Sequence, residues 1–380
     1  MIYLDNAATS WPKPPAVVQA VCRALEAAGG NPGRTNHRLS FGAAEMIQEC
    51  RENLARLFHI ANPLRICFTA NATEALNLAL KGLLSPGDHV ICSSMEHNSV
   101  WRPLVRLQES GVEVSIAASG PGGTVSAAAV AAQVRPNTRL IAIIHASNVS
   151  GAITPVAEIG DLAHERGILL LLDAAQTAGA IPIEVGTMHV DLLAFPGHKS
   201  LLGPQGTGGL FVSEAVQLMP LKEGGTGSDS SNQHQPDILP DRFESGTLNT
   251  PGIAGLNQAA LYLLDRGVEE VRRYEAELTQ RLVIGLAETS NVTVYGPPPG
   301  ETRAAVVSFN IGAVDSVRTA DELERRWGIA SRSGLHCAPL AHRTLGTCKT
   351  GAVRFSPGPF TTTEEIDIAL RAVRELSEKA

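Results

Sequence analysis

Two side chains near the middle of the sequence, an acid and an amine, have types and positions suited to covalent chemistry. Asp173 ends the apolar run ILLLLD (168–173), and Lys199 ends the tripeptide GHK (197–199) after the next apolar run, DLLAF. A carboxylate at the end of a buried parallel strand lies where α/β folds place their ligands. Alone, such an acid is as often a helix cap, and such a lysine is usually solvated. Together they fit a pyridine-aldehyde cofactor, which needs a lysine for a Schiff base and an acid beside its ring nitrogen.

Two further polar segments each follow a strand-like run. Asn71-Ala72-Thr73-Glu74 comes after RICFT (65–69), where the free N–H groups that open a helix can bind phosphate and Thr73 can add a hydroxyl. A plain helix cap is the commoner role for such a segment. Met95-Glu96-His97-Asn98 comes after HVICS (89–93), a position from which the imidazole of His97 could lie over a planar ring.

The elements that carry these residues alternate between apolar runs and helical patterns. The expected strands are 65–69, 89–93, 138–147, 168–173 and 191–195, and the helices between them include 155–167. This alternation predicts an α/β fold with a mainly parallel sheet flanked by helices, in a large domain over 15–255. After it, a long helical stretch over 258–288, strands near 305–311 and 352–356, and helices near 319–327 and from 362 predict a smaller C-terminal α+β domain over 256–380. The segment 1–14 is expected to pack with this smaller domain, and 223–236 is expected to be a mobile loop.

Composition excludes several classes of function. The 380 residues carry 31 Lys+Arg against 38 Asp+Glu, a net charge of −7, so a nucleic-acid partner is not expected. The six cysteines form no C-x-x-C pair, which argues against a metal site or a disulfide framework and favours a reducing, cytoplasmic location. Neither a signal peptide nor a membrane span is expected.

The chain resembles the class V (fold type I) superfamily of pyridoxal-phosphate (PLP) enzymes, and within it the cysteine desulfurase and selenocysteine lyase branch. The matching segments follow the family's order over nearly the whole chain: YLDNAAT (3–9), ATEALN (72–77), MEHNS (95–99), HASNVSG (145–151), DAAQ (173–176), GHK (197–199), FESGTLNT (243–250) and RSGLHCA (332–338). The resemblance implies the PLP fold type I, PLP as cofactor, a small amino-acid substrate and a homodimer with a shared active site.

The resemblance also implies roles for single residues. Lys199 would hold PLP, Asp173 would pair with the ring nitrogen, and His97 would stack on the ring and help to move protons. The other implied cofactor contacts are Gln176 at the phenolic oxygen, Ala72, Thr73 and His198 at the phosphate, Asn148, and Thr247 at the phosphate of the neighbouring subunit. The implied substrate contacts are Arg354 at the carboxylate, with Arg332, Asn148 and His37 lining the pocket.

Cys337 selects the branch within the superfamily. It occupies the family position of the cysteine that becomes a persulfide, and Arg332 and His336 nearby would favour its thiolate. We therefore expect conversion of L-cysteine to L-alanine, with the sulfur passing to Cys337 and then to an acceptor protein, for iron–sulfur or other thiocofactor assembly. The alternatives are a selenocysteine, cystine or cysteine-sulfinate lyase, a class V aminotransferase or epimerase, and a non-catalytic relative that binds partners.

The chain departs from the family pattern at several positions. Pro196 replaces a hydroxyl residue that often binds phosphate, and Leu335 replaces a second histidine before the cysteine. The segment FSPGPFTT after Arg354 differs from the Tyr-Asn-Thr run of relatives. Cys348 has no family role, so we expect a surface cysteine rather than a resolving thiol.

Overall fold

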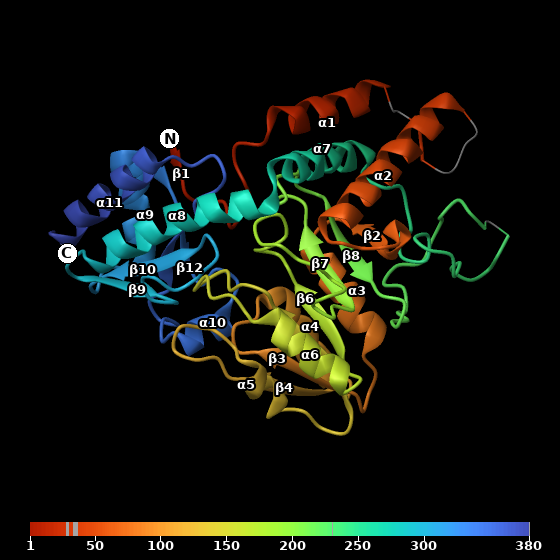
Figure 1. The fold of residues 1–380 in the computed structure, drawn as a ribbon, viewed down its shortest axis with the longest axis horizontal. Coiled ribbons are helices and arrows are strands. Elements are labelled where there is room, and N and C mark those ends of the chain that lie inside the picture. The colour runs from red at the N-terminus through yellow and green to blue at the C-terminus, as the bar shows by residue number, and fades with distance from the viewer. Residues whose placement is uncertain (28–29, 33–36, 230, 380) are drawn as a thin grey trace.

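The computed structural model describes residues 1–27, 30–32, 37–229 and 231–379. Within them, the largest element is a seven-stranded sheet with the order β2-β8-β7-β6-β5-β3-β4 (Figure 1). Neighbouring strands are parallel except β8, which runs antiparallel to both β2 and β7. The strands are β2 (Ile66–Thr69), β3 (His89–Ser93), β4 (Glu113–Ala117), β5 (Thr138–Ile144), β6 (Leu169–Asp173), β7 (Leu192–Pro196) and β8 (Gly208–Val212).

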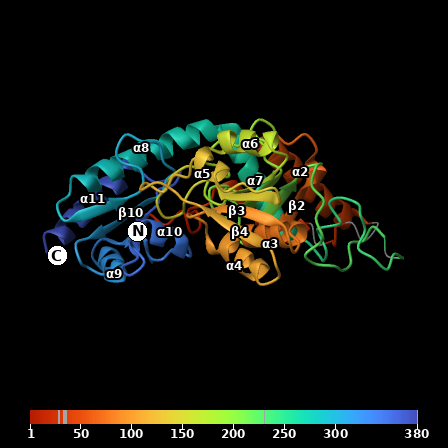
Figure 2. The same ribbon diagram turned by 90° about the horizontal axis from the view of Figure 1, so that it is seen from below.

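Helices cover both faces of this sheet, and the strands are apolar on both faces for that reason. On β6, Leu170 and Leu172 pack in one hydrophobic cluster and Leu171 packs in another. Figure 2 shows the two helical layers on opposite sides of the sheet. One layer contains α3 (Ala72–Leu83) and α4 (Asn98–Gln108), and the other contains α2 (Arg38–Leu57), α5 (Ala127–Ala131), α6 (Val156–Glu165) and α7 (Thr250–Arg266), with α1 (Pro15–Ala27) packed outside α7.

A smaller antiparallel sheet with the order β12-β13-β10-β9 forms the second part of the molecule. Its own hydrophobic cluster includes Phe309, Phe355 and Leu4. The N-terminal strand β1 (Ile2–Tyr3) pairs with β11 (Ile329–Ala330) in this part of the molecule. The other elements are β9 (Val292–Tyr295), β10 (Val307–Ile311), β12 (Arg332–Gly334), β13 (Ala352–Phe355), α8 (Val268–Ala287), α9 (Ser316–Trp327), α10 (Pro339–Thr344) and α11 (Thr363–Ser377).

The long helical stretch expected over 258–288 consists of two helices. Gly267 separates α7 from α8 with a φ of 84°, a backbone conformation that residues other than glycine rarely adopt. Most of α7 packs in the cluster of the large sheet, whereas Leu278, Leu282 and Leu286 of α8 pack in that of the small sheet. We therefore propose Gly267, rather than residue 255, as the boundary between the domains.

The expected fold class is confirmed, and most predicted strands lie within two or three residues of their observed bounds. The segment 223–236 contains no helix or strand among its described residues. In the part of the chain that the structure describes, no helix is both long and apolar enough to cross a membrane.

Candidate active site

Asp173 lies at the carboxyl end of β6, where the backbone leaves the sheet. Its side chain is almost fully buried, and its Oδ1 accepts a hydrogen bond of 2.9 Å from the Ala175 N–H. Burial raises the pKa of this carboxyl group, against the lowering effects of the Ala175 hydrogen bond and of the charge on Lys199. Burial and one backbone hydrogen bond thus position the acid, and the charge of Lys199 acts on it.

Lys199 follows β7 in a tight turn that the local sequence requires. A side chain at Gly197 would collide with the Thr207 hydroxyl, and the Gly197 N–H donates to the Thr207 carbonyl at 2.8 Å. Burial lowers the pKa of Lys199 to about 8, with Asp173 and Cys337 raising it and Arg354 and Arg332 lowering it further. With this pKa, about a tenth of the amine is neutral at pH 7, and the neutral amine can act as a nucleophile and as a base.

The N-terminal segment forms hydrogen bonds with this turn. Thr9 Oγ1 and Lys13 Nζ both donate to the His198 carbonyl, at 3.1 and 2.9 Å. Gln176 Nε2 donates to the Ala7 carbonyl at 3.1 Å. The segment that follows β1 therefore helps to fix the positions of both His198 and Gln176.

His97 is the N-cap of α4, and this fixes the tautomer of its ring. Its Nδ1 accepts from the Ser99 N–H at 3.1 Å, so the proton of the neutral ring lies on Nε2. Burial lowers the pKa of His97 to about 3, and the charges of Lys199, Arg332 and Arg102 contribute. The ring is therefore neutral at pH 7.

The first turn of α3 offers donors for an anion. Asn71 caps the helix by accepting from the Glu74 N–H at 3.0 Å, which leaves the N–H groups of Ala72 and Thr73 without an intrahelical partner. Thr73 Oγ1 lies 2.8 Å from Ser99 Oγ, which links α3 to the start of α4. This geometry suits a phosphate group.

One cavity brings most of the predicted cofactor residues together. It is lined by Ala72, Thr73, His97, Asn148, Asp173, Gln176, His198 and Lys199. Pro196 also lines it, at the position where the family pattern often has a hydroxyl group. Within the cavity, Asn148 Oδ1 and His198 Nδ1 are buried and have no hydrogen-bond partner. Such atoms are costly to bury unless a ligand satisfies them.

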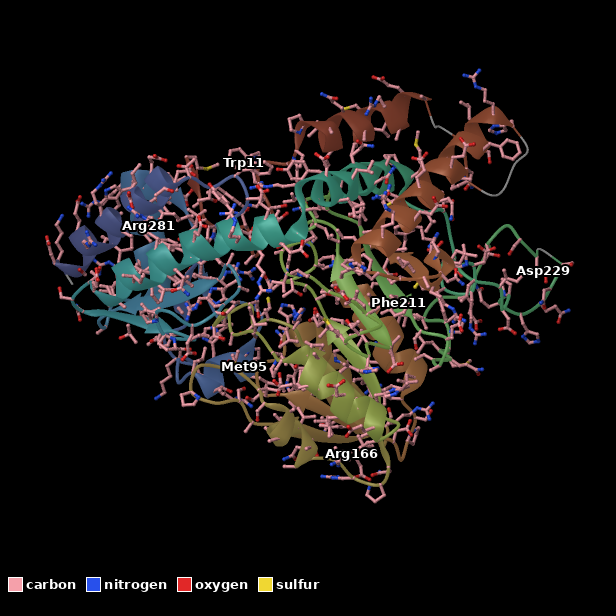
Figure 3. All side chains as sticks on the ribbon, viewed as in Figure 1. Trp11, Met95, Arg166, Phe211, Asp229 and Arg281 are labelled. Carbon is pink, nitrogen blue, oxygen red and sulfur yellow. The ribbon has the colours of Figure 1, made fainter. Side chains whose placement is uncertain are left out.

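Cys337 lies in an exposed loop that is held in an unusual conformation. His336 and Cys337 have φ values of 49° and 56°, although neither residue is glycine. The Asn98 N–H donates to the Cys337 carbonyl at 2.8 Å, and Asn148 Nδ2 donates to the His336 carbonyl at 2.7 Å. The following Ala338 packs in a small cluster with Met95, which Figure 3 labels. The loop is therefore tied to the start of α4 and to the cavity wall.

Two arginines lie beside this loop. Arg332 Nη2 donates to Cys337 Sγ at 3.6 Å. Arg354 is buried, with its Nη2 2.7 Å from Asp5 Oδ1 and its Nη1 donating to the Asn148 carbonyl at 3.1 Å. The Asp5 carboxylate thus pairs with the guanidinium that the family resemblance assigns to a substrate carboxylate.

Two predicted residues lie away from this cavity within the single chain. His37 is exposed and caps α2, accepting from the Ser40 N–H at 3.3 Å. Thr247 accepts a hydrogen bond of 3.4 Å from Asn31 Nδ2 and lines a different hollow, together with Arg51 and Glu244. The role of Thr247 in a neighbouring subunit stays a prediction. Cys348 is also exposed, and it makes no hydrogen bond with Cys337.

Sequence reasoning missed two buried groups behind the site. Glu96 Oε1 accepts from Ser93 Oγ, the Ser93 N–H and the Ile144 N–H, so it joins the ends of β3 and β5. Burial, opposed by the Ser93 hydrogen bond and assisted by Asp173, raises the pKa of Glu96 to about 8. It therefore holds a proton at neutral pH. Its place between Met95 and His97 in the MEHN segment was the only signal in the sequence.

The second missed group is a chain of polar side chains behind the Cys337 loop. His336 Nδ1 lies 3.2 Å from His342 Nε2, and His342 Nδ1 lies 2.7 Å from Thr347 Oγ1. Both imidazoles are buried, and burial lowers the pKa of His342 to about 4. Both rings are thus neutral and connect the loop to α10 and to the turn that follows it. No spacing rule in the sequence pointed to His342.

Comparison with known proteins supports one family. The aminotransferase class-V family matches residues 2–369. A relative from Methanothermobacter thermautotrophicus, named a probable cysteine desulfurase, is 36% identical, with 99% of this chain and 94% of the relative covered. The apo structure of a cysteine desulfurase from Thermococcus onnurineus has a TM-score of 0.94 at 33% identity, covering 100% of this chain and 95% of that one. A cysteine desulfurase structure from Escherichia coli has a TM-score of 0.89 at 27% identity, covering 99% and 94%. The chain that carries Lys199, Asp173 and His97 in one cavity therefore belongs to the aminotransferase class-V family.

Proposed function

We propose that this protein is a PLP-dependent cysteine desulfurase, which converts L-cysteine to L-alanine and takes the sulfur onto Cys337. One observation carries the proposal. Cys337 is exposed and accepts a hydrogen bond from Arg332. It lines a hollow that adjoins the cavity containing Lys199 and Asp173, because His97 lines both. An aminotransferase of this family has no need of a thiol at that place.

The cavity fits PLP on the chemistry of its donors. Asn148 Oδ1 and His198 Nδ1 are buried and unpartnered at its wall, and the first turn of α3 presents free N–H groups for a phosphate. Lys199 would hold the cofactor covalently, Asp173 would face its ring nitrogen, and His97 would lie against its ring. When bound, PLP supplies an electron sink for the substrate's α-carbon.

Lys199 is the group suited to move the substrate's proton. Its lowered pKa of about 8 keeps a fraction of the amine neutral near pH 7. Once the amine of L-cysteine has released Lys199 from the cofactor, the freed Nζ atom would accept the proton from the α-carbon of L-cysteine. Asp173, the largest favourable charge acting on Lys199, holds that amine near its place.

Cys337 is the group suited to receive sulfur. Its thiolate would attack the sulfur of L-cysteine, so that an S–S bond forms on Sγ and the carbon–sulfur bond of the substrate breaks. The electron pair of the broken bond stays on carbon, which takes a proton and becomes the methyl group of alanine. The net change turns one cysteine and the Cys337 thiol into alanine and a Cys337 persulfide, with no external oxidant.

Arg354 would bind the carboxylate of the substrate. Its guanidinium is buried and pairs with the carboxylate of Asp5, which supports a carboxylate as its ligand. Buried Arg354 Nε has no partner and offers another donor. We propose that the substrate carboxylate shares or takes the place of Asp5.

The assembly and location complete the proposal. A homodimer would bring Thr247 of one subunit to the phosphate site of the other. A cytoplasmic location is supported by the six free cysteines. The sulfur would leave Cys337 for an acceptor protein.

The test is alanine formed from L-cysteine by the PLP-loaded protein, with Cys337→Ala beside the wild type. We expect alanine from the wild type and a large loss in the variant, although the absorbance of the bound cofactor is retained in both. Equal activity in the two proteins would refute the sulfur-acceptor role. Turnover of selenocysteine, cystine or cysteine sulfinate instead of L-cysteine, or of an amino-group acceptor, would assign the site to one of the other reactions of this superfamily.

A further inference from the structure

A second hollow opens on the outer side of His97, between α3, α4 and the Cys337 loop. Its lining includes Lys81 from α3, Arg102 and Arg106 from α4, and Cys337 itself, and we call it the basic groove. Among the described residues that line it, none is an acid. In a chain with a net charge of −7, positive charge is therefore concentrated beside the thiol.

Two of these cations are available to a partner. Lys81 and Arg102 are exposed, and neither forms an ion pair among the residues that the structure describes. Arg106 is also exposed and pairs with Glu109 at 2.5 Å. The charge of Arg102 reaches the site, because it contributes to the lowered pKa of His97, after burial and the charges of Lys199 and Arg332.

The arrangement of the cations favours an extended occupant. Arg102 and Arg106 are one helical turn apart, which places them about 5–6 Å from one another along one face of α4. Lys81 comes from α3, which packs beside α4 on the same face of the large sheet (Figure 2). A polypeptide with several carboxylates could contact all three cations at once, whereas a small thiol could contact one or two.

We propose that the basic groove receives an acidic polypeptide segment, whose cysteine thiol accepts the sulfur from Cys337. This inference rests on the proposed function, and it specifies the acceptor by its charge. The acceptor thiolate would attack the outer sulfur of the Cys337 persulfide. The S–S bond on Cys337 breaks, its electron pair stays on Sγ as the Cys337 thiolate, and the acceptor becomes the persulfide. Atoms and electrons balance without a further reductant.

The experiment uses PLP-loaded protein that carries the persulfide and three thiol peptides of equal length. The single cysteine of each peptide is flanked by glutamates, glutamines or lysines, and dithiothreitol serves as an uncharged small acceptor. Transfer to the peptide is followed at low and at high salt. We expect the glutamate peptide to react faster than the glutamine peptide by about tenfold at low salt, and this preference to shrink at high salt because exposed charges are screened.

Charge-reversal variants locate the effect. Arg102→Glu and Lys81→Glu should each reduce the preference for the glutamate peptide several-fold, because each replaces an attractive exposed charge pair with a repulsive one. The matched control is Arg166→Glu, which makes the same charge change at the exposed end of α6, on the other face of the sheet (Figure 3). Alanine formed in a single turnover should be equal in the wild type, Lys81→Glu and Arg166→Glu, whose substituted residues do not act on His97.

The same transfer rate to all three peptides would overturn the inference. A preference that Arg102→Glu and Lys81→Glu leave unchanged, or that Arg166→Glu reduces equally, would also overturn it. Transfer only to dithiothreitol would likewise exclude a polypeptide at this groove. A wild-type protein that forms neither alanine nor persulfide would instead refute the proposed function, so the two failures are distinguishable.

Discussion

Replacing His342 with alanine should slow sulfur uptake by Cys337, although His342 touches neither cofactor nor substrate in our proposal. His336 and Cys337 both adopt left-handed backbone conformations, and each such residue costs about 1–3 kcal/mol. The loop keeps this conformation through the carbonyl contacts of Asn98 and Asn148 and through the contact between His336 and His342. The contact with His342 thus helps to hold the loop in its strained conformation.

The magnitude follows from the atom that the substitution leaves behind. Without the His342 ring, His336 Nδ1 is buried and loses its hydrogen-bond partner, which costs about 1–3 kcal/mol. This energy would lower the fraction of molecules whose Cys337 loop has the observed conformation. Sulfur uptake would then fall by about tenfold, and by about a hundredfold at most. His342→Gln, which can still bond to His336, should recover much of the rate.

The assay is a single turnover of the PLP-loaded protein with L-cysteine, quenched rapidly and analysed for alanine and for sulfur on Cys337. Cofactor absorbance and substrate affinity should stay at wild-type values, which separates loop placement from loss of the fold. Alkylation adds a second readout, because Cys337 should change its reactivity while the exposed Cys22 and Cys348 do not. Leu335→Ala, in the same loop but exposed, is the control. A folded His342→Ala protein with wild-type uptake would refute the reasoning.

Three further substitutions test the site and its supports. Lys199→Ala should abolish borohydride-fixed cofactor and lower alanine formation by about 10²–10⁴, the range for a lost general base; cofactor still fixed to the protein would exclude Lys199 as its anchor. Between pH 6.5 and 8 the wild type should lose stability, because folded Glu96 keeps its proton up to its pKa of about 8, whereas unfolded Glu96 has already lost it. Glu96→Gln should remove up to about 1.4 kcal/mol per pH unit of that slope, measured by urea unfolding, and an unchanged slope would contradict a buried protonated acid. Glu244→Ala leaves Arg51 buried and unpaired, so we expect a loss of about 3–5 kcal/mol in unfolding free energy, and a loss below about 1 kcal/mol would show that water reaches Arg51.

Much of the fold was predictable because the central strands are buried on both faces. The runs ending in Asp173 and Pro196 are apolar throughout, and a short run of this kind is typical of a strand covered by helices on both sides. β8 was missed because its first two residues, Gly208 and Gly209, interrupt the apolar pattern that is typical of a buried strand. Both are glycine because a side chain there would collide with the backbone or with Phe195. The break at Gly267 was missed because apolar residues recur with helical spacing on both sides of it.

Only the site residues that belong to recognisable motifs could be predicted from the sequence. Lys199, Asp173 and His97 stand at the ends of predicted strands, so the topology alone brings them together. The Asp5–Arg354 pair joins residues 349 positions apart, which no local pattern can connect. Glu96 and His342 act through burial and through hydrogen bonds to other elements. Burial of a single polar residue cannot be predicted from the spacing of apolar residues in the sequence.

The most direct test of sulfur uptake by Cys337 is the mass of the peptide that contains it. The PLP-loaded protein is mixed with one equivalent of L-cysteine without an acceptor, digested without reductant after the thiols are blocked, and analysed by mass spectrometry. The proposed chemistry predicts one added sulfur atom on Cys337, in step with the alanine formed, and none on Cys22 or Cys348. Alanine formed without any sulfur on Cys337 would contradict it.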